Sequence, residues 1–137
     1  MRTYCIDASA MVIYLTEKKV NNAFKKILVS IEKGESIGII STVNIAEFHR
    51  AITRLTSEDK ADKYVTWIQE SKIEIISPSI EIACLASGRK QEYASAKDPF
   101  AWGDAFCLAT AIKYHADCII TSDDEFDQVQ EIMIMKI

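Results

Sequence analysis

Short apolar runs alternate along this chain with longer segments of helical periodicity. The runs lie at 3–6, 37–40, 73–76 and 118–121, and a last apolar run covers 132–137. Continuous apolar runs of this length are typical of strands that are buried on both faces of a parallel sheet. We therefore predict four or five strands that are connected by helices.

The segments between these runs carry helix signals. In residues 18–33, apolar side chains such as Phe24 and Ile31 recur at helical spacing, and Gly34 follows as a C-terminal cap. Ser9 can cap a shorter helix that precedes this segment and ends at about Thr16. Strands that alternate with helices predict an α/β fold, a three-layer α/β/α sandwich with a mostly parallel central sheet of four or five strands. The predicted helices span 9–16, 18–33, 41–55, 56–70, 77–88 and 103–115, with a short helical segment near Phe126.

Composition and charge exclude several classes of protein for this chain. The 137 residues fit one domain, and no apolar run is long enough to span a membrane. Asp7 interrupts the apolar stretch near the N-terminus, so we expect no signal peptide and a cytoplasmic protein. The four cysteines lie far apart, with two histidines in the chain, and are interpreted as buried, reduced thiols. The net charge of −4 argues against a protein that holds nucleic acid by a large positive field.

The stretch 118–127 raises a question of charge, because a buried strand is followed there by four acids within five positions. Two carboxylates about 5 Å apart repel by roughly 3 kcal/mol at an effective dielectric constant near 20, so water or a cation must compensate. In an open parallel sheet, the functional crevice lies beyond the carboxyl ends of the strands. Asp7 follows the first strand and Asp123 the fourth, so both are expected at this edge. Either residue could instead be a solvated turn acid or a helix cap.

Two further acids lie on predicted helices. The 41–55 helix directs an apolar stripe that includes Leu55 at the core, with Glu47 at the margin of that stripe. The alternative for Glu47 is a surface ion pair with Arg50. Asp104 lies in the first turn of a helix that is apolar nearly all round, so we expect it to be buried, although it could also serve as a cap.

Four carboxylates from separated positions form the oxygen-ligand set that Mg²⁺ or Mn²⁺ prefers. Such a site can bind one or two ions, lower the pKa of a bound water and stabilise the charge that develops when a phosphodiester is attacked in line. Phosphate oxygens would complete the coordination, so an acidic protein can still hold RNA. The predicted ligands are Asp7, Glu47, Asp104 and Asp123, with Asp127 as a weaker candidate, whereas Asp124 and Glu125 are interpreted as solvated residues of a helical first turn.

Four segments of the chain resemble motifs of the PIN-domain nucleases, and within that family the small VapC-type toxins of toxin–antitoxin pairs. The segments are CIDASA at 5–10, VNIAEFHRA at 43–51, GDAFCLATA at 103–111 and IITSDDEF at 119–126. They occur in the order found in the family, and the resemblance covers nearly the whole chain. It implies a PIN-like fold and a metal-dependent endoribonuclease whose four acids are catalytic, with the hydroxyls of Ser9 and Thr121 beside them. It also implies a homodimer and a cognate antitoxin that covers the site.

Phosphate groups of the RNA need basic partners near the motifs, and each basic candidate could equally be ordinary surface charge. Other classes of protein also stay open. A receiver or phosphohydrolase would use an aspartate as phosphoryl acceptor, although Ser9 stands where a phosphohydrolase has an acid. A PIN-like module could bind only partners, and a PIN nuclease could be a housekeeping RNA-processing enzyme, although the short chain favours a toxin. The basic candidates are Arg50, Arg54, Arg89 and Lys97.

Overall fold

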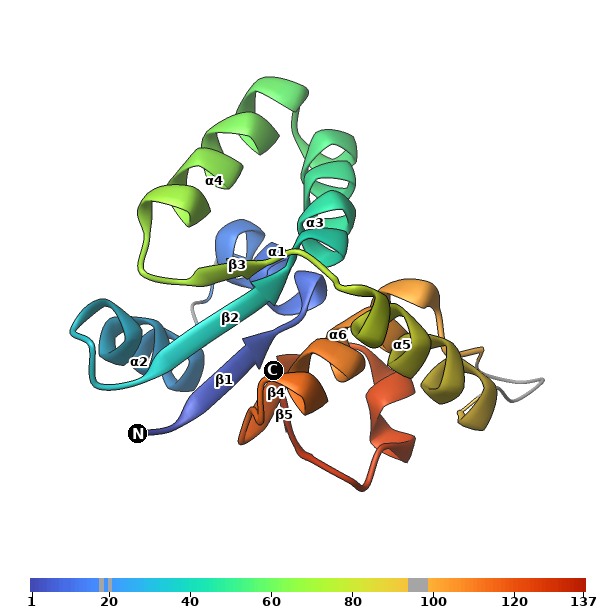
Figure 1. Ribbon diagram of the computed structural model, residues 1–137. Helices are drawn as coiled ribbons and strands as arrows, with labels where there is room; N and C mark the ends of the chain where they lie inside the picture. Colours follow the sequence, from blue (N-terminus) through green and yellow to red (C-terminus); the bar gives the residue numbers. More distant parts are fainter. Residues whose placement is uncertain (18, 20, 94–98) are drawn as a thin grey trace.

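A five-stranded sheet forms the centre of the computed structural model, which describes residues 1–17, 19, 21–93 and 99–137 (Figure 1). All neighbouring strands are parallel, and their order is β3-β2-β1-β4-β5. This sheet confirms the predicted fold class. The strands are β1 (Thr3–Ile6), β2 (Ile37–Ser41), β3 (Glu74–Ile76), β4 (Cys118–Thr121) and β5 (Met133–Lys136).

Helices cover both faces of the sheet and produce the three predicted layers (Figure 1). One core cluster joins the sheet to α1 through α4, and the other joins it to α5, α6 and η1. No helix in the described part of the chain is both long and apolar enough to cross a membrane. The helices are α1 (Ala8–Thr16), α2 (Asn22–Glu32), α3 (Thr42–Leu55), α4 (Glu58–Glu70), α5 (Ile80–Glu92), α6 (Trp102–Lys113) and the 3₁₀ helix η1 (Asp124–Gln128).

Helix starts differ in part from the prediction. The first helix begins at Ala8, and its N-cap residue is Asp7, which makes no side-chain cap bond. Ser9 therefore does not cap this helix. The helix predicted from 18 begins at Asn22 in the described residues, where the Asn21 side chain accepts a bond from the backbone N–H of Phe24 at 2.9 Å, and residue 18 lies outside them.

Two side chains that were predicted to be buried lie at the surface. Leu55 is 63% exposed, because it is the last residue of α3 and extends past the core that Phe48 and Ile52 enter. Cys84 is exposed on α5, whereas the other three cysteines are buried. All four cysteines are free thiols, so the predicted reduced state is confirmed and the predicted burial is wrong for Cys84.

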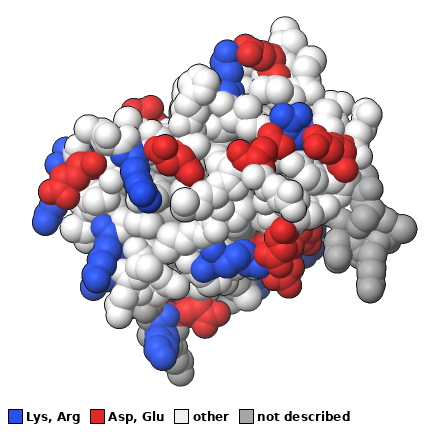
Figure 2. Space-filling model, turned by 90° about the horizontal axis from the view of Figure 1, so that it is seen from below, with Lys and Arg blue, Asp and Glu red and all other residues white. Residues whose placement is uncertain are grey.

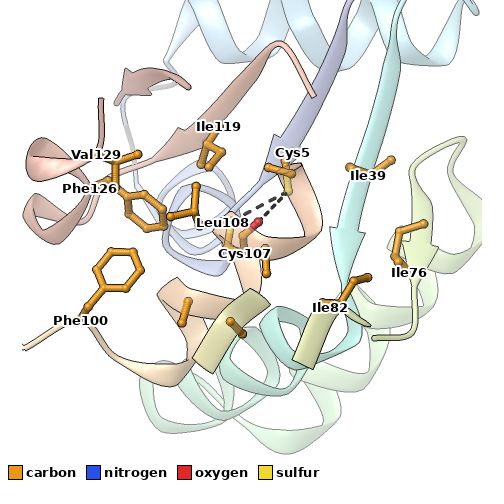
Figure 3. Packing of buried hydrophobic residues seen from close by; sticks show 14 residues of the cluster. Cys5, Ile39, Ile76, Ile82, Phe100, Cys107, Leu108, Ile119, Phe126 and Val129 are labelled. Carbon is orange, nitrogen blue, oxygen red and sulfur yellow. Dashed lines mark hydrogen bonds between the residues drawn. The ribbon is translucent and has the colours of Figure 1, made fainter. Parts of the chain in front are cut away.

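The core beneath α6 joins this helix, which carries Asp104, to β1, which is followed directly by Asp7 (Figure 3). Cys5 in β1 lies with its Sγ 3.6 Å from the carbonyl oxygen of Cys107 and 3.9 Å from the Cys107 Sγ. The hydrogen bond with Cys5 and the burial of the site raise the pKa of the Cys107 thiol, which therefore stays neutral. These contacts hold α6 against β1 close to both acids.

Candidate metal centre

The acidic residues meet where the order of the strands reverses. The chain runs from β1 outward to β2 and β3, and it later returns to place β4 on the other side of β1. Such a switch point leaves a crevice beyond the carboxyl ends of the two central strands. Ile6 pairs with Ile120, and the backbone N–H of Asp7 donates to the Ile120 carbonyl at 2.9 Å. The loop after β1 therefore lies directly beside the loop after β4.

Three carboxylates converge at this crevice. One oxygen from each of Asp7, Asp104 and Asp123 lies within 4.8 Å of the others. Asp7 is 1% exposed and Asp104 is 5% exposed, and among the described residues no Lys or Arg forms an ion pair with any of the three. Asp104 also accepts a bond from the backbone N–H of Ala101 at 3.3 Å, so it caps α6 while its carboxylate lies in the cluster.

The two carboxylate oxygens of Asp7 have different surroundings. The Oδ2 atom accepts bonds from the hydroxyls of Ser9 at 2.7 Å and Thr121 at 2.8 Å. Among the hydrogen bonds of the described residues, the Oδ1 atom takes part only in a long contact of 3.4 Å with the side-chain amide of Asn44. The two hydroxyls thus orient the carboxylate and leave Oδ1 as the oxygen that can bind a ligand.

The same two hydroxyls position Asp123. The Ser9 Oγ accepts a bond from the N–H of Ser122 at 2.9 Å, and the Thr121 Oγ1 accepts one from the N–H of Asp123 at 3.0 Å. Each hydroxyl therefore joins Asp7 to the backbone of the loop after β4. This network explains why small hydroxyl residues accompany the two strand-end acids.

Asn44 is a polar residue of the site that the sequence analysis did not identify. It is fully buried in α3, and its Nδ2 donates to the Glu47 Oε1 at 2.9 Å and to the Gly103 carbonyl at 3.1 Å. The sequence feature that could have identified Asn44 is its position three residues before Glu47, because this spacing places both side chains on one helix face. Its Oδ1 atom has no hydrogen-bond partner among the described residues, although a buried polar atom usually has one.

Glu47 lies close enough to Asp7 and Asp104 for their charges to interact, and it does not pair with Arg50 among the described ion pairs. Glu47 is exposed as a whole residue, but its carboxylate packs against the buried Gly103. A Cβ added to Gly103 would occupy the space of this carboxylate. This local burial raises the pKa of Glu47, the bond from Asn44 lowers it, and the charge of Asp7 raises it further. The glycine before Asp104 therefore has a specific role, because it allows the Glu47 carboxylate to approach α6.

The remaining acids of the 124–127 stretch separate into two kinds. Asp124 and Asp127 are exposed and pair with the Lys136 Nζ at 2.7 and 3.0 Å. Glu125, in contrast, is half-buried, and its negative charge raises the pKa of both Asp104 and Asp123. The interpretation of Glu125 as a solvated residue is therefore wrong, because the turn of η1 directs it towards the crevice.

The basic candidates have three different environments. Arg50 and Arg54 line a surface hollow of about 420 Å³ that begins at Glu47. Arg89 is engaged by Glu131, with Nε to Oε1 at 2.9 Å, and by Glu92 at 3.7 Å. Lys97 lies outside the described residues.

The proximity of the acids changes their protonation. Burial raises the pKa of Asp104 to about 7, and the charges of Asp7 and Glu125 act in the same direction. Burial likewise raises the pKa of Asp123 to about 8, with the charge of Asp7 as the next cause. Buried carboxylates without a basic partner are the donor set of a hard divalent cation, so the residues present fit Mg²⁺ or Mn²⁺.

We expect the metal-free protein to lose stability as the pH rises from about 4 to about 8. In this window the folded protein binds more protons than the unfolded chain, whose aspartates ionise near pH 4, so the free energy of unfolding falls by up to about 1.4 kcal/mol for each unit by which a pKa is raised. Thermal unfolding in EDTA across this range measures the effect. Asp123→Asn should flatten the curve, whereas the exposed Asp124→Asn should leave its slope unchanged. An Asp123→Asn curve as steep as that of the unaltered protein would contradict the assignment.

Comparisons with known proteins agree on one fold. A family model for the PIN domain matches residues 4–132, and no curated protein sequence matches the chain.

The chain is similar to VapBC2 from Rickettsia felis bound to a DNA fragment from its promoter, at 15% identity and a TM-score of 0.76 over 98% of each chain. It is similar to DNA-bound VapBC from Salmonella typhimurium at 14% identity and a TM-score of 0.77, over 99% of this chain and 98% of the other. It is also similar to VapC20 from Mycobacterium tuberculosis, a sarcin-ricin loop cleaving toxin, at 12% identity and a TM-score of 0.72, over 96% of this chain and 98% of the other. At these identities the likeness to solved structures concerns the fold.

Proposed function

The chain belongs to the PIN-domain family of nucleases, and on that premise we propose that it is an endoribonuclease that depends on Mg²⁺ or Mn²⁺. The observation that carries the proposal is the convergence of Asp7, Asp104 and Asp123 within 4.8 Å. Their oxygens fit a hard cation, and the crevice that they line opens at the edge of the sheet where ligands bind in open parallel folds.

Asp7, Asp104 and Asp123 would hold the cation, with Glu47 at the margin of the site. When bound, the cation supplies an acidified water and neutralises charge on the phosphate under attack. Asp7 would contribute its Oδ1, because Oδ2 is occupied by the hydroxyls of Ser9 and Thr121. These two hydroxyls hold Asp7 and the loop of Asp123 in one arrangement before the substrate binds.

Glu47 is the residue best placed to move a proton. Its Oε1 accepts the bond from Asn44, so Oε2 can take the proton that the attacking water loses. Burial of its carboxylate against Gly103 raises its pKa above the usual value of a glutamate, and a carboxylate of higher pKa is a stronger base. The water then attacks phosphorus, and the bond to the leaving sugar oxygen breaks on the opposite side.

The test is cleavage of RNA by the purified protein, free of any partner. We expect cleavage with Mg²⁺ or Mn²⁺, no cleavage in excess EDTA, and recovery when the metal is restored. Thermal unfolding on the same samples gives a second readout, because a cation that binds only the folded state raises its stability. Cleavage that continues undiminished in EDTA would refute the metal-dependent mechanism.

The net charge of −4 gives the protein no large positive field, so local groups at the crevice would have to hold the RNA. On the face shown in Figure 2, acidic and basic side chains are interspersed. Arg50 and Arg54 follow Glu47 along one face of α3 and line the adjoining hollow. No carboxylate pairs with either of them among the described ion pairs. We therefore assign them to phosphate groups beside the scissile bond.

Replacing Arg50 and Arg54 together by Ala should weaken RNA binding about tenfold or more at low salt, because each phosphate contact adds affinity that salt screens. The fold should survive, since both side chains lie on the exposed face of α3. A gel-shift titration at two salt concentrations measures the affinity and the salt slope. Lys25→Ala with Lys26→Ala on α2 is the matched control for lost charge. Unchanged affinity and slope in the Arg variant would count against the assignment.

The finer proposal is that the protein is the toxin of a type II toxin–antitoxin pair. The VapBC relatives were crystallised with their partner proteins, and the likeness extends over nearly the full length of each chain. By this likeness we also propose a homodimer and a cognate antitoxin. Sedimentation at micromolar concentration tests the dimer, and a neighbouring reading frame for a small antitoxin would distinguish the toxin from a housekeeping nuclease.

A further inference from the structure

One buried side chain beside the acidic crevice has a polar atom that finds no partner. Asn44 lies in the first turn of α3 and is fully buried, and its Oδ1 accepts no hydrogen bond among the described residues. A buried carbonyl oxygen without a donor lowers the stability of the fold, so native proteins contain few of them. Another part of this side chain must therefore favour the arrangement.

The nitrogen of the same amide accounts for the orientation. The Asn44 Nδ2 faces three oxygens, the Glu47 Oε1 at 2.9 Å, the Gly103 carbonyl at 3.1 Å and the Asp7 Oδ1 at 3.4 Å. A backbone carbonyl and ionised carboxylates only accept hydrogen bonds. If the amide were rotated by 180°, its Oδ1 would face these three oxygens and be repelled by them. The three acceptors thus fix the orientation of the amide.

Distance decides which acceptor the amide serves. An amide nitrogen carries two hydrogens, and good N–H···O bonds are roughly 2.7–3.2 Å long. The bonds to Glu47 and Gly103 lie within this range, whereas the contact with Asp7 lies beyond it. The Gly103 carbonyl lies inside α6, where a carbonyl also accepts from the N–H four residues on. Glu47 is an exposed residue whose described hydrogen bond is the one from Asn44, so it depends on this amide most.

We propose that Asn44 is a positioning residue, which holds the Glu47 carboxylate over Gly103 and for this role leaves its own Oδ1 without a partner. The inference rests on the proposed nuclease function, in which Glu47 takes a proton from the attacking water. An exposed glutamate samples several rotamers, whereas a carboxylate that is held at one oxygen directs the other oxygen to one place. Asn44 acts through Glu47 and not on the RNA, because it is fully buried.

Replacing Asn44 separates its effect on cleavage from its effect on stability. Asn44→Leu keeps the branched shape and removes both the donor and the oxygen without a partner. We expect kcat for RNA cleavage in Mn²⁺ to fall about 10- to 100-fold and KM to change by less than about twofold. The melting temperature in EDTA should equal or exceed that of the unaltered protein. Asn44→Ala, a second variant without added bulk, should show the same fall in kcat.

Thr110 offers a matched control for the loss of a buried polar atom. It is fully buried in α6, and its Oγ1 also has no partner among the described residues. Thr110→Val should therefore leave kcat unchanged. Asn44→Leu combined with Glu47→Gln should cleave no more slowly than the slower of the two single variants. Stabilisation by Mn²⁺ should persist in Asn44→Leu, because the amide makes no bond of normal length to Asp7.

A measurement of stability tests the contact without any cleavage. Asn44→Asp replaces the donor by an acceptor beside the Glu47 Oε1, so the melting temperature in EDTA should fall. Adding Glu47→Gln reverses the bond, since the new amide can donate to the new carboxylate, and should restore at least half of the loss. Adding the exposed Asp124→Asn instead removes the same charge elsewhere and should restore none of it.

The outcomes separate this inference from the function on which it rests. Restoration by Glu47→Gln together with absent cleavage by the unaltered protein in Mg²⁺ would support the hold on Glu47 and refute the nuclease. Metal-dependent cleavage with an unchanged kcat in a folded Asn44 variant would leave the nuclease intact and overturn the positioning role. Absent restoration, or loss of the Mn²⁺ stabilisation in Asn44→Leu, would also overturn it. If neither the Leu nor the Ala variant folds, Asn44 is a structural residue and the inference is wrong.

Discussion

Asp104→Asn should give a protein that is folded, inactive and insensitive to metal. The substitution keeps the size of the side chain and an oxygen that can accept the Ala101 N–H, so the start of α6 should be preserved. It removes one of three carboxylates within 4.8 Å, so a cation should lose much of its affinity. RNA cleavage should fall by about two to three orders of magnitude, the range seen when one charge-stabilising group is removed from an active site.

The stability of Asp104→Asn gives the more specific readout. In EDTA its melting temperature should equal or exceed that of the unaltered protein, because the neutral amide removes both the cost of burying a charge and the repulsion with Asp7 and Glu125, which together raise the pKa of Asp104. Added Mn²⁺ at 100 times its dissociation constant stabilises a folded protein by about 2.7 kcal/mol, and this gain should shrink in the variant. Asp124→Asn is the matched control, since it removes the same charge from an exposed neighbour that pairs with Lys136. A variant that keeps full activity, or that unfolds with and without metal, would make Asp104 a structural acid.

Gly103→Ala should abolish most of the activity through a single methyl group. The new Cβ would occupy the space of the Glu47 carboxylate, and the end of that side chain can move away towards solvent. The helix should tolerate the change, because Ala is favoured over Gly in a helix by up to about 1 kcal/mol. The displaced Glu47 would leave both its bond from Asn44 and its position as the proton acceptor. We expect cleavage to fall about 100-fold, with a melting temperature close to that of the unaltered protein.

Gly88→Ala is a matched control for this variant. Gly88 also lies inside a helix, α5, and an added Cβ would meet no atom within 4 Å. It should raise stability by about 0.5–1 kcal/mol and leave cleavage unchanged. A double-mutant cycle with Glu47→Gln then tests whether Gly103→Ala lowers cleavage through Glu47. If it does, the double variant should lose no more activity than the more impaired single variant. Additive losses, or a Gly103→Ala protein with full activity, would refute the role of Gly103 in placing Glu47.

Local patterns were sufficient for most of the fold. Continuous apolar runs such as 118–121 identify strands that are buried on both faces, and the predicted helix start at Ser41 and the C-terminal glycine Gly34 lie where the structure has helix ends. These features depend on the backbone preferences of a few neighbouring residues. The burial of individual side chains was predicted less well. Leu55 and Cys84 have the apolar character of core residues, but Leu55 ends α3 beyond the core, and Cys84 lies on the solvent-facing side of α5 between the buried Ile82 and Ala86.

Candidate acids could be selected from the sequence because of their positions at strand ends and on buried helix turns. The contacts between them could not. Asn44 and Gly103 were not identified as residues of the site, and Glu125 was interpreted as a solvated residue. Each gained its role from a partner that lies far away in the chain, such as the Gly103 carbonyl for Asn44, 59 positions apart.

The sequence by itself determined the alternation of strands and helices, the parallel sheet and the set of acids that lie at its edge, because these follow from apolar periodicity and from the preferences of capping residues. The tertiary structure alone decided that β4 inserts beside β1, which brings Asp123 to Asp7 and creates the switch point beneath Asp104. It also decided that the Asp7 Oδ2 is occupied and that Oδ1 is left for a ligand. The physical reason is that strand order and hydrogen-bond partners depend on packing between residues more than 100 positions apart, and no local pattern records that packing.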